Sequence, residues 1–186
     1  MSLFSRKKKL IVSGCSYTDD YATTQNLKSF PLWSELLAEK LDMECINVGK
    51  VAFGNKAIYS TLIDQVVSQK NVGLAISMWS EFQRVSFYMG EGNLPKGIDE
   101  KMLWSCFHPD RDYLEGEWHD QFYDDPEKNP AKKDYVYKVS KVIRENGLGG
   151  MKGGTYDSIR MMYSFQTICE SLDIPHLQVQ GCIPIM

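Results

Sequence analysis

Short apolar segments alternate with amphipathic segments along this chain of 186 residues, and this alternation constrains the fold more than any other feature. Four apolar segments predict strands, at 9–13, 44–48, 71–78 and 177–181. The third has no clean polar/apolar alternation, as expected of a strand covered on both faces. Helical spacing predicts helices at 31–41, from Gly54-Asn55 onward, at 134–145 and at 155–172. The pattern therefore predicts an α/β fold in which helices sandwich a mainly parallel sheet.

Local signals predict where two of these helices begin and which face they bury. Pro31 is expected as the first residue of the first helix, which should bury Trp33, Leu36, Leu37 and Leu41. Thr155 is expected to cap the last helix, after a glycine-rich linker at 147–154. The apolar face of this last helix is expected to contain Ile159, Met162, Phe165, Cys169 and Leu172.

Between about residues 85 and 134 the periodicity disappears, and glycines and prolines interrupt an aromatic, acidic stretch. We interpret this stretch as an irregular insertion within one domain that covers residues 1–186, because a chain of this length favours a single domain. The aromatic side chains of the insertion are interpreted as a small satellite core. The alternative is a surface that faces a substrate or a partner.

Composition excludes several classes of partner. The chain has 21 Lys and Arg against 24 Asp and Glu, a formal net charge of −3, so we expect no nucleic-acid partner. No apolar run approaches the roughly 18 residues that suggest a membrane span. We read no secretion signal, because the short apolar run after the basic residues 6–9 is polar again by Ser13 and no small-residue cleavage site follows.

The cysteines point to a reducing compartment. Their number is five, which is odd, and none of them forms a Cys-x-x-Cys pair, which argues against both a zinc ribbon and a disulfide framework. We therefore expect a cytoplasmic protein with no metal and no cofactor. His119, which lies beside Glu117 and Asp120, is interpreted as part of a solvated surface because the group lacks ligand spacing.

Ligands of open parallel sheets bind outside the carboxyl ends of the strands, so the segments 13–20, 47–55 and 79–84 are the first candidates for a site. In the first of them, the turn Gly14-Cys15-Ser16 is expected to lift the Ser16 hydroxyl out of the sheet and to leave its backbone N–H available for an oxyanion. Gly54, in the second segment, can present another N–H to the same point, because glycine allows close approach of the backbone.

These blocks resemble those of the SGNH, or GDSL-like, hydrolases. Gly14-Cys15-Ser16 is similar to the Gly-Asp-Ser of the first block, with Cys15 in place of the aspartate, and Gly54 is similar to the oxyanion-hole glycine of the second. The resemblance covers residues 9–84 and, more loosely, 134–181. It implies a three-layer α/β/α sandwich with a flavodoxin-like sheet. It also implies a serine esterase mechanism in which Ser16 is the nucleophile.

The chain departs from the family in its third and last blocks. Residues 79–84 contain no asparagine, so a third oxyanion donor would come from Ser80, Gln83 or Asn55, or would be absent. The letters of the family's Asp-x-x-His recur at residues 173–176, but we interpret them as a turn at the amino end of the last strand. The general-base histidine is therefore expected either beyond Met186 or in the insertion, which contains His108 and His119.

Two functions remain open from the sequence. One is a hydrolase of small-molecule esters, with a short acyl ester or a carbohydrate as the expected substrate class. The other is a catalytically incomplete binding module on the same fold, in which the hydroxyls and amides of the loop 13–18 hold a phosphate or a sugar. An exposed sheet edge near the end of the chain would favour pairing of copies, so a homo-oligomer is an expectation as well.

Overall fold

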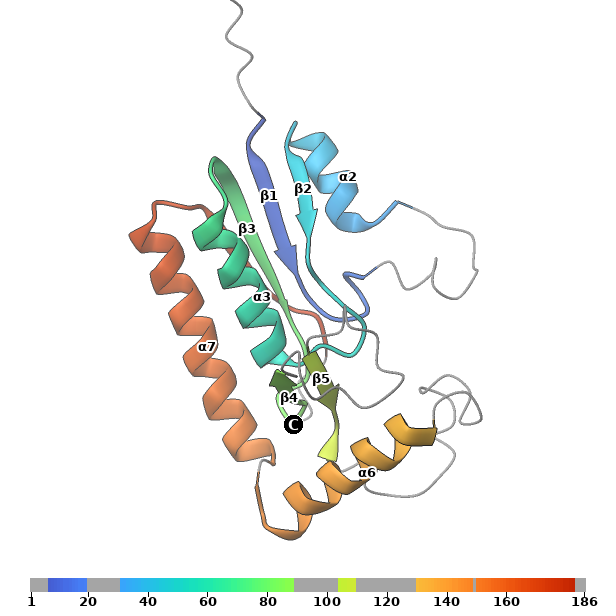
Figure 1. Ribbon diagram of the computed structural model, residues 1–186. Coiled ribbons are helices and arrows are strands. Elements are labelled where there is room, and N and C mark those ends of the chain that lie inside the picture. Colours follow the sequence, from blue (N-terminus) through green and yellow to red (C-terminus); the bar gives the residue numbers. More distant parts are fainter. Residues whose placement is uncertain (1–6, 20–30, 89–103, 110–129, 149, 183–186) are drawn as a thin grey trace, which may run out of the picture.

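The structure is a computed structural model that describes residues 7–19, 31–88, 104–109, 130–148 and 150–182 (Figure 1). Its centre is a parallel sheet of four strands, β1 (Lys9–Ser13), β2 (Glu44–Asn47), β3 (Val72–Trp79) and β6 (His176–Gln180). The spatial order is β2-β1-β3-β6. The predicted α/β fold with a mainly parallel sheet is confirmed, and the order begins as flavodoxin-like sheets do.

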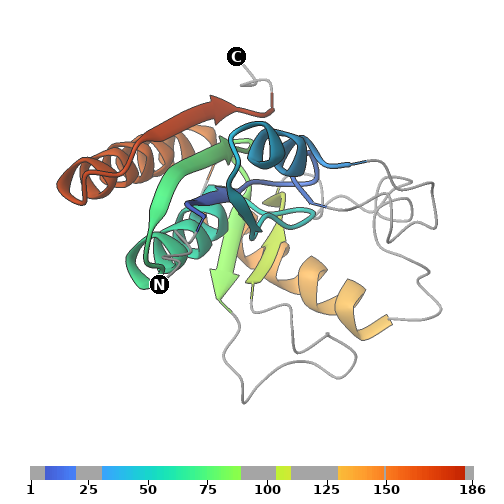
Figure 2. The ribbon, with the colours of Figure 1, turned by 90° about the horizontal axis from the view of Figure 1, so that it is seen from above.

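Helices cover both faces of the sheet (Figures 1 and 2). Helices α3 (Asn55–Ser68) and α7 (Met151–Ser171) lie on one face and α2 (Trp33–Lys40) on the other. The strands divide their side chains accordingly, because successive residues of a strand point to opposite faces. Ile11 packs in the cluster of α3 and α7, whereas Leu10 and Val12 pack with Ala38 of α2. The result is three layers with a core on each side of the sheet.

Helix α2 begins two residues later than predicted, and only part of its predicted apolar face packs against the sheet. Its first residue is Trp33, not Pro31, and the backbone N–H of Leu32, the residue before it, donates to the Glu35 carboxylate at 3.1 Å. The predicted Trp33 and Leu37 pack against the core, whereas the predicted Leu36 and Leu41 are exposed. The fully buried residues of α2 are Ser34 and Ala38. Small side chains take the contact with the sheet because they let the helix approach it closely.

Helix α7 begins before the predicted cap. Its first residue is Met151, after Gly150 with φ of 90°, and the Thr155 hydroxyl donates to the Met151 carbonyl inside the helix. The glycines that suggested a linker have a packing role, since a Cβ on Gly154 would collide with the Phe82 carbonyl oxygen. Phe165 and Cys169 are buried as predicted, but Ile159 and Leu172 are exposed.

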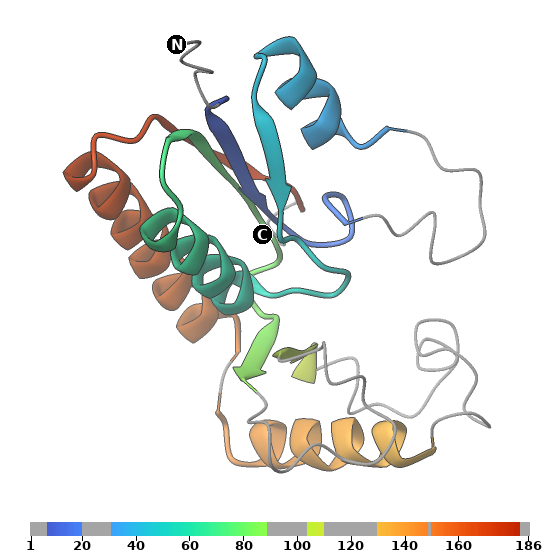
Figure 3. The same ribbon diagram turned by 45° about the horizontal axis from the view of Figure 1, so that its top comes forward.

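The described part of the insertion contains regular structure. It contains an antiparallel pair of strands, β4 (Val85–Tyr88) and β5 (Trp104–Phe107), and α6 spans Pro130–Glu145. Figures 1 and 3 show the pair and α6 beyond the carboxyl end of the parallel sheet. Trp104 packs against Tyr88 with ring centroids 5.4 Å apart and also against the α3 and α7 core. The prediction of a wholly irregular segment is therefore wrong, because pairing between distant strands leaves little local signal.

Candidate functional site at the carboxyl edge of the sheet

The loops that follow β1 and β2 are joined to each other by hydrogen bonds. The Lys50 backbone N–H donates to the Gly14 carbonyl at 3.1 Å, and the Asn47 side chain donates to the Thr18 carbonyl at 2.6 Å. The Asp19 carboxylate accepts from the Val51 N–H at 2.9 Å. These contacts hold the turn after β1 in one place at the carboxyl edge of the sheet.

Ser16 is the exposed hydroxyl of this turn. The backbone N–H groups of Thr18 and Asp19 donate to the Cys15 carbonyl at 2.9 and 3.1 Å, which closes the turn around Ser16. Ser16 and Tyr17 face outward, whereas Cys15 and Thr18 are buried. The structure therefore places the Ser16 hydroxyl out of the sheet, where the sequence predicts it.

Two other hydroxyls of this loop are used inside the fold. Ser13 is fully buried and its hydroxyl lies 2.9 Å from the hydroxyl of Thr61 on α3. The Thr18 hydroxyl donates to the Met78 sulfur at 3.5 Å. Of the serine and threonine hydroxyls at residues 13–18, a phosphate or sugar would therefore find only that of Ser16 exposed.

Gly54 is the residue before the first turn of α3, so its position at the helix start agrees with the sequence prediction. Burial raises the pKa of the Cys106 thiol on β5. The Ser86 hydroxyl and the Gly54 backbone N–H, which is directed toward this thiol, lower the pKa by smaller amounts. A Cβ on Gly54 would lie 2.6 Å from the Ser86 hydroxyl oxygen. Only glycine therefore lets α3 begin this close to β4.

Asn55 ties three elements together. Its Oδ1 accepts from the backbone N–H of Ser80 at 2.7 Å, and its Nδ2 donates to the Ser158 hydroxyl of α7 at 2.8 Å. Asn55, Ser80 and Ser158 are all buried. Two of the predicted third oxyanion donors are therefore engaged within the fold. The Asn55 amide positions the loop after β3, and the Ser80 N–H donates to Asn55. The Gln83 Oε1 is buried with no hydrogen-bond partner in the described segments.

A largely buried charged cluster lies in the same region. The Arg84 guanidinium donates to the Glu81 carboxylate at 2.9 Å and to the Phe53 carbonyl at 3.0 Å. The Nε2 atom of His108 lies 2.6 Å from the Glu81 carboxylate and 3.1 Å from Arg84 Nε. One ring nitrogen cannot accept from Arg84 and donate to Glu81 together, and the shorter contact with the carboxylate favours donation to Glu81.

His108 is a candidate from the sequence, but its partners are not. Glu81 and Arg84 follow β3 and so were in the expected edge segment, but their pairing with His108 depends on where β5 lies. The second histidine of the insertion, His119, lies outside the described residues together with Glu117 and Asp120. His108 is thus the histidine that the described part of the insertion brings to this edge.

A pair of thiols also lies at this edge. The Sγ atoms of Cys15 and Cys182 are 3.9 Å apart, and the Ser80 hydroxyl is 3.9 Å from Cys182 Sγ. The pKa of Cys15 is lowered to about 5, chiefly by the hydrogen bond from Cys182 and further by the Tyr17 N–H and the charge of Arg84, against the effect of burial. The pKa of the Cys182 thiol is raised, because that thiol donates to Cys15.

His176 lies where the sequence analysis expects it. It is the first residue of β6 and pairs with Ala75, and Asp173 before it has φ of 55°. Its ring packs edge-on against Phe165 with centroids 5.7 Å apart. Residues 173–176 are therefore the turn between α7 and β6, as predicted, and His176 contacts the core under α7.

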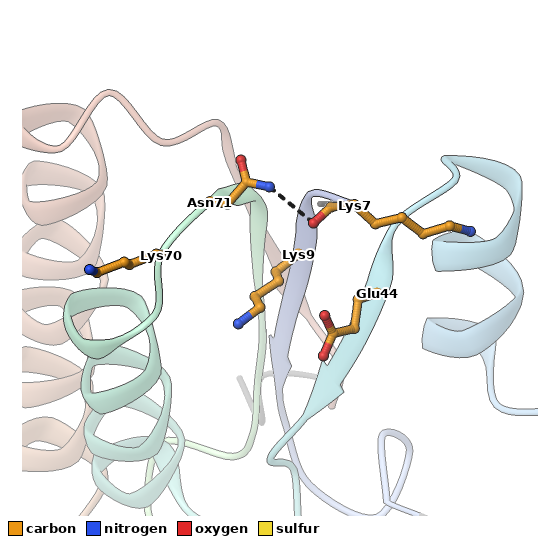
Figure 4. A pocket seen from close by; sticks show the side chains of 5 residues that line it. All are labelled: Lys7, Lys9, Glu44, Lys70 and Asn71. Atoms are coloured by element: carbon orange, nitrogen blue, oxygen red, sulfur yellow. Dashed lines mark hydrogen bonds between the residues drawn. The ribbon is translucent and has the colours of Figure 1, made fainter. Parts of the chain in front are cut away.

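The surface also has a hollow at the opposite, amino edge of the sheet (Figure 4). This cavity of about 280 Å³ is lined by Lys7, Lys9, Glu44, Lys70 and Asn71. Two of its ammonium groups are engaged, since Lys9 donates to Gln69 at 2.6 Å and Lys7 pairs with Asp42 at 2.5 Å. Glu44 further reduces the positive charge of the hollow, so it is a weak candidate for an anion site.

None of the helices in the described segments has both the length and the apolar content that a membrane crossing needs. No group of three or more His, Cys, Asp or Glu side chains in those same segments could hold a metal ion. The sequence matches no protein-family model and no curated protein.

Proposed function

We propose that this chain is an SGNH-like serine hydrolase that cleaves a small-molecule ester, with Ser16 as the nucleophile. The observation that carries the proposal is the exposure of Ser16 on a closed turn after β1, between the buried Cys15 and Thr18. A hydroxyl held in this way at the carboxyl edge of a parallel sheet can meet a substrate without rearrangement of the core.

The proposed reaction begins with attack of the Ser16 hydroxyl oxygen on the ester carbonyl carbon. The negative oxygen of the tetrahedral intermediate is stabilised by backbone N–H groups, and we assign this role to Ser16 and Gly54. Gly54 supports the assignment because it directly precedes α3, at the helix end where the dipole favours negative charge. Its N–H is directed toward the buried Cys106 thiol, a weak acceptor, so an oxyanion would have to compete with this contact.

The reaction also needs a base that takes the proton of Ser16. We assign this role to a histidine of the insertion, and His108 is the candidate among the described residues. Its contact with Glu81 at 2.6 Å orients the ring as a carboxylate orients a catalytic histidine. When Nε2 donates to Glu81, Nδ1 is the basic nitrogen of the neutral ring, and because this nitrogen is buried, the ring must turn outward before it takes the proton of Ser16.

The proposal is tested by labelling the full chain with a fluorophosphonate and measuring the intact mass. We expect one label per chain in the wild type and in Ser171→Ala, which removes a remote exposed hydroxyl, and no label in Ser16→Ala. His108→Gln is expected to slow labelling by about 100-fold or more, the usual contribution of a general base. An unlabelled wild-type chain, or equal labelling of Ser16→Ala, would refute the hydrolase.

The binding-module alternative has less support from the loop 13–18. Ser13 and Thr18 direct their hydroxyls into the fold, which removes two of the groups that would hold a phosphate or a sugar. An unlabelled chain that still binds inorganic phosphate in a calorimeter, with binding lost in Ser16→Ala, would favour this alternative over the hydrolase.

A further inference from the structure

Two cysteines that are far apart in the sequence meet at the carboxyl edge of the sheet. Cys15 follows β1 and Cys182 follows β6, 167 positions later, yet their sulfur atoms are 3.9 Å apart. A disulfide requires about 2.05 Å between the sulfurs. Closure therefore requires the two sulfurs to approach by about 2 Å, which is within the range of side-chain rotation.

The backbone on both sides of the pair is held in place. The Gly181 N–H donates to the Trp79 carbonyl at 2.8 Å and so extends the β3–β6 pairing up to Cys182. The Gln180 side chain donates to the carbonyls of Ser80 and Cys182 at 3.1 and 3.0 Å. With the turn after β1 closed on the Cys15 carbonyl, neither cysteine depends on a loose segment for its position.

The surroundings separate this pair from the other three cysteines. Burial is the largest effect on the thiols of Cys45, Cys106 and Cys169, and it raises the pKa of each one. Cys15 instead receives hydrogen bonds from the Cys182 thiol and the Tyr17 N–H, and it lies within the field of Arg84. Since the thiolate is the reactive form of cysteine, Cys15 is the thiol most readily oxidised.

Access to the pair is restricted to small reagents. Cys15 is 1% exposed, whereas its partner Cys182 is partly exposed. A hydroperoxide such as hydrogen peroxide is small enough to reach the pair.

We propose that Cys15 and Cys182 form a redox modification site that a hydroperoxide converts into a disulfide. The Cys15 thiolate attacks one peroxide oxygen, the O–O bond breaks, and Cys15 becomes a sulfenic acid while hydroxide leaves and takes the proton of Cys182. The Cys182 thiolate then attacks the Cys15 sulfur and expels a second hydroxide, which takes up the proton that Cys15 had released on ionisation. Two thiols are oxidised by two electrons, and one hydrogen peroxide is reduced to two waters.

The disulfide joins β6 to the loop that carries Ser16. Its formation does not depend on Ser16 being a nucleophile, so the site stands or fails separately from the hydrolase proposal. In the folded chain it converts a contact between thiols into a covalent connection across β1, β3 and β6.

The test is oxidation of the full chain with about one equivalent of hydrogen peroxide, followed by alkylation and peptide mapping without reduction. We expect the chain to lose two hydrogens, the number of alkylatable thiols to fall from five to three, and the peptides of Cys15 and Cys182 to be joined. A reductant should restore all five thiols.

Matched variants complete the test. Cys45→Ser, which removes a cysteine outside the pair, should still form the bond, and Cys182→Ser should instead accumulate oxidised Cys15. The wild-type map decides the question even where a variant folds poorly. Peptides of Cys15 and Cys182 that remain unlinked after oxidation, or a bond that joins either of them to another cysteine, would overturn the proposal.

Discussion

Replacement of Asn55 by alanine should destabilise the chain strongly, because this one side chain satisfies two buried groups on other elements. In Asn55→Ala, the Ser80 N–H loses its acceptor at 2.7 Å and the Ser158 hydroxyl loses its donor at 2.8 Å. A buried polar group without a partner costs about 1–3 kcal/mol, so the two together predict a loss of about 2–4 kcal/mol where water partly replaces the amide. For a chain of this size that corresponds to a decrease of about 4–16 °C in Tm.

Guanidinium unfolding followed by circular dichroism measures this loss. Asn55→Asp is the matched variant, because its carboxylate can still accept from the Ser80 N–H and from the Ser158 hydroxyl of α7. Its negative charge is also favoured at the start of α3. We expect Asn55→Asp to lose at least about 1 kcal/mol less than Asn55→Ala. A change below about 0.5 kcal/mol in Asn55→Ala, the level of an ordinary surface substitution, would refute the reasoning.

Three further predictions concern packing and ionisation. Gly54→Ala places a Cβ 2.6 Å from the Ser86 hydroxyl and should lower the free energy of unfolding by about 1–3 kcal/mol. The control is Gly153→Ala, whose Cβ would meet no neighbouring atom within 4 Å, and it should be neutral or stabilising in the same denaturation assay. Phe165→Ala removes a fully buried ring 6.3 Å from Trp79 and should cost about 3–5 kcal/mol; a loss under about 1 kcal/mol would contradict the burial. The pKa of Cys15 is lowered from 9.0 to about 5, so the thiolate absorbance at 240 nm, taken as wild type minus Cys15→Ala, should disappear as the pH falls through about 5. The stability of wild type relative to that variant should rise between pH 5 and 9, because in this range only the unfolded thiol holds its proton. A difference signal that instead titrates near 9 would contradict the lowered pKa.

The exposed Ser16 turn could be predicted because its determinants are local. A short apolar strand that stops at Gly14 places the next hydroxyl at the carboxyl edge, whichever elements pack around it. The turn before His176 was predictable for the same reason, since its position relative to β6 follows from chain order alone. Both predictions needed only the order of strands and helices.

The hydrogen-bond partners in the candidate site could not be predicted in this way. Thr155 has the residue type of a helix cap, but α7 begins four residues earlier because Gly154 lets the helix lie directly against Phe82. The contact of His108 with Glu81 depends on the β4–β5 pairing, which local patterns do not reveal. Each of these outcomes depends on contacts between distant segments.

The sequence by itself determined the class of fold and the edge at which the candidate site lies, because apolar periodicity and chain order act along the chain. Only the tertiary structure decided which side chains meet there. Cys15 and Cys182 come within 3.9 Å because β1 and β6 flank β3 in the same parallel sheet. Their 167 intervening positions carry no local sign of this contact, since register and crossover geometry arise only when the sheet and its helices pack together.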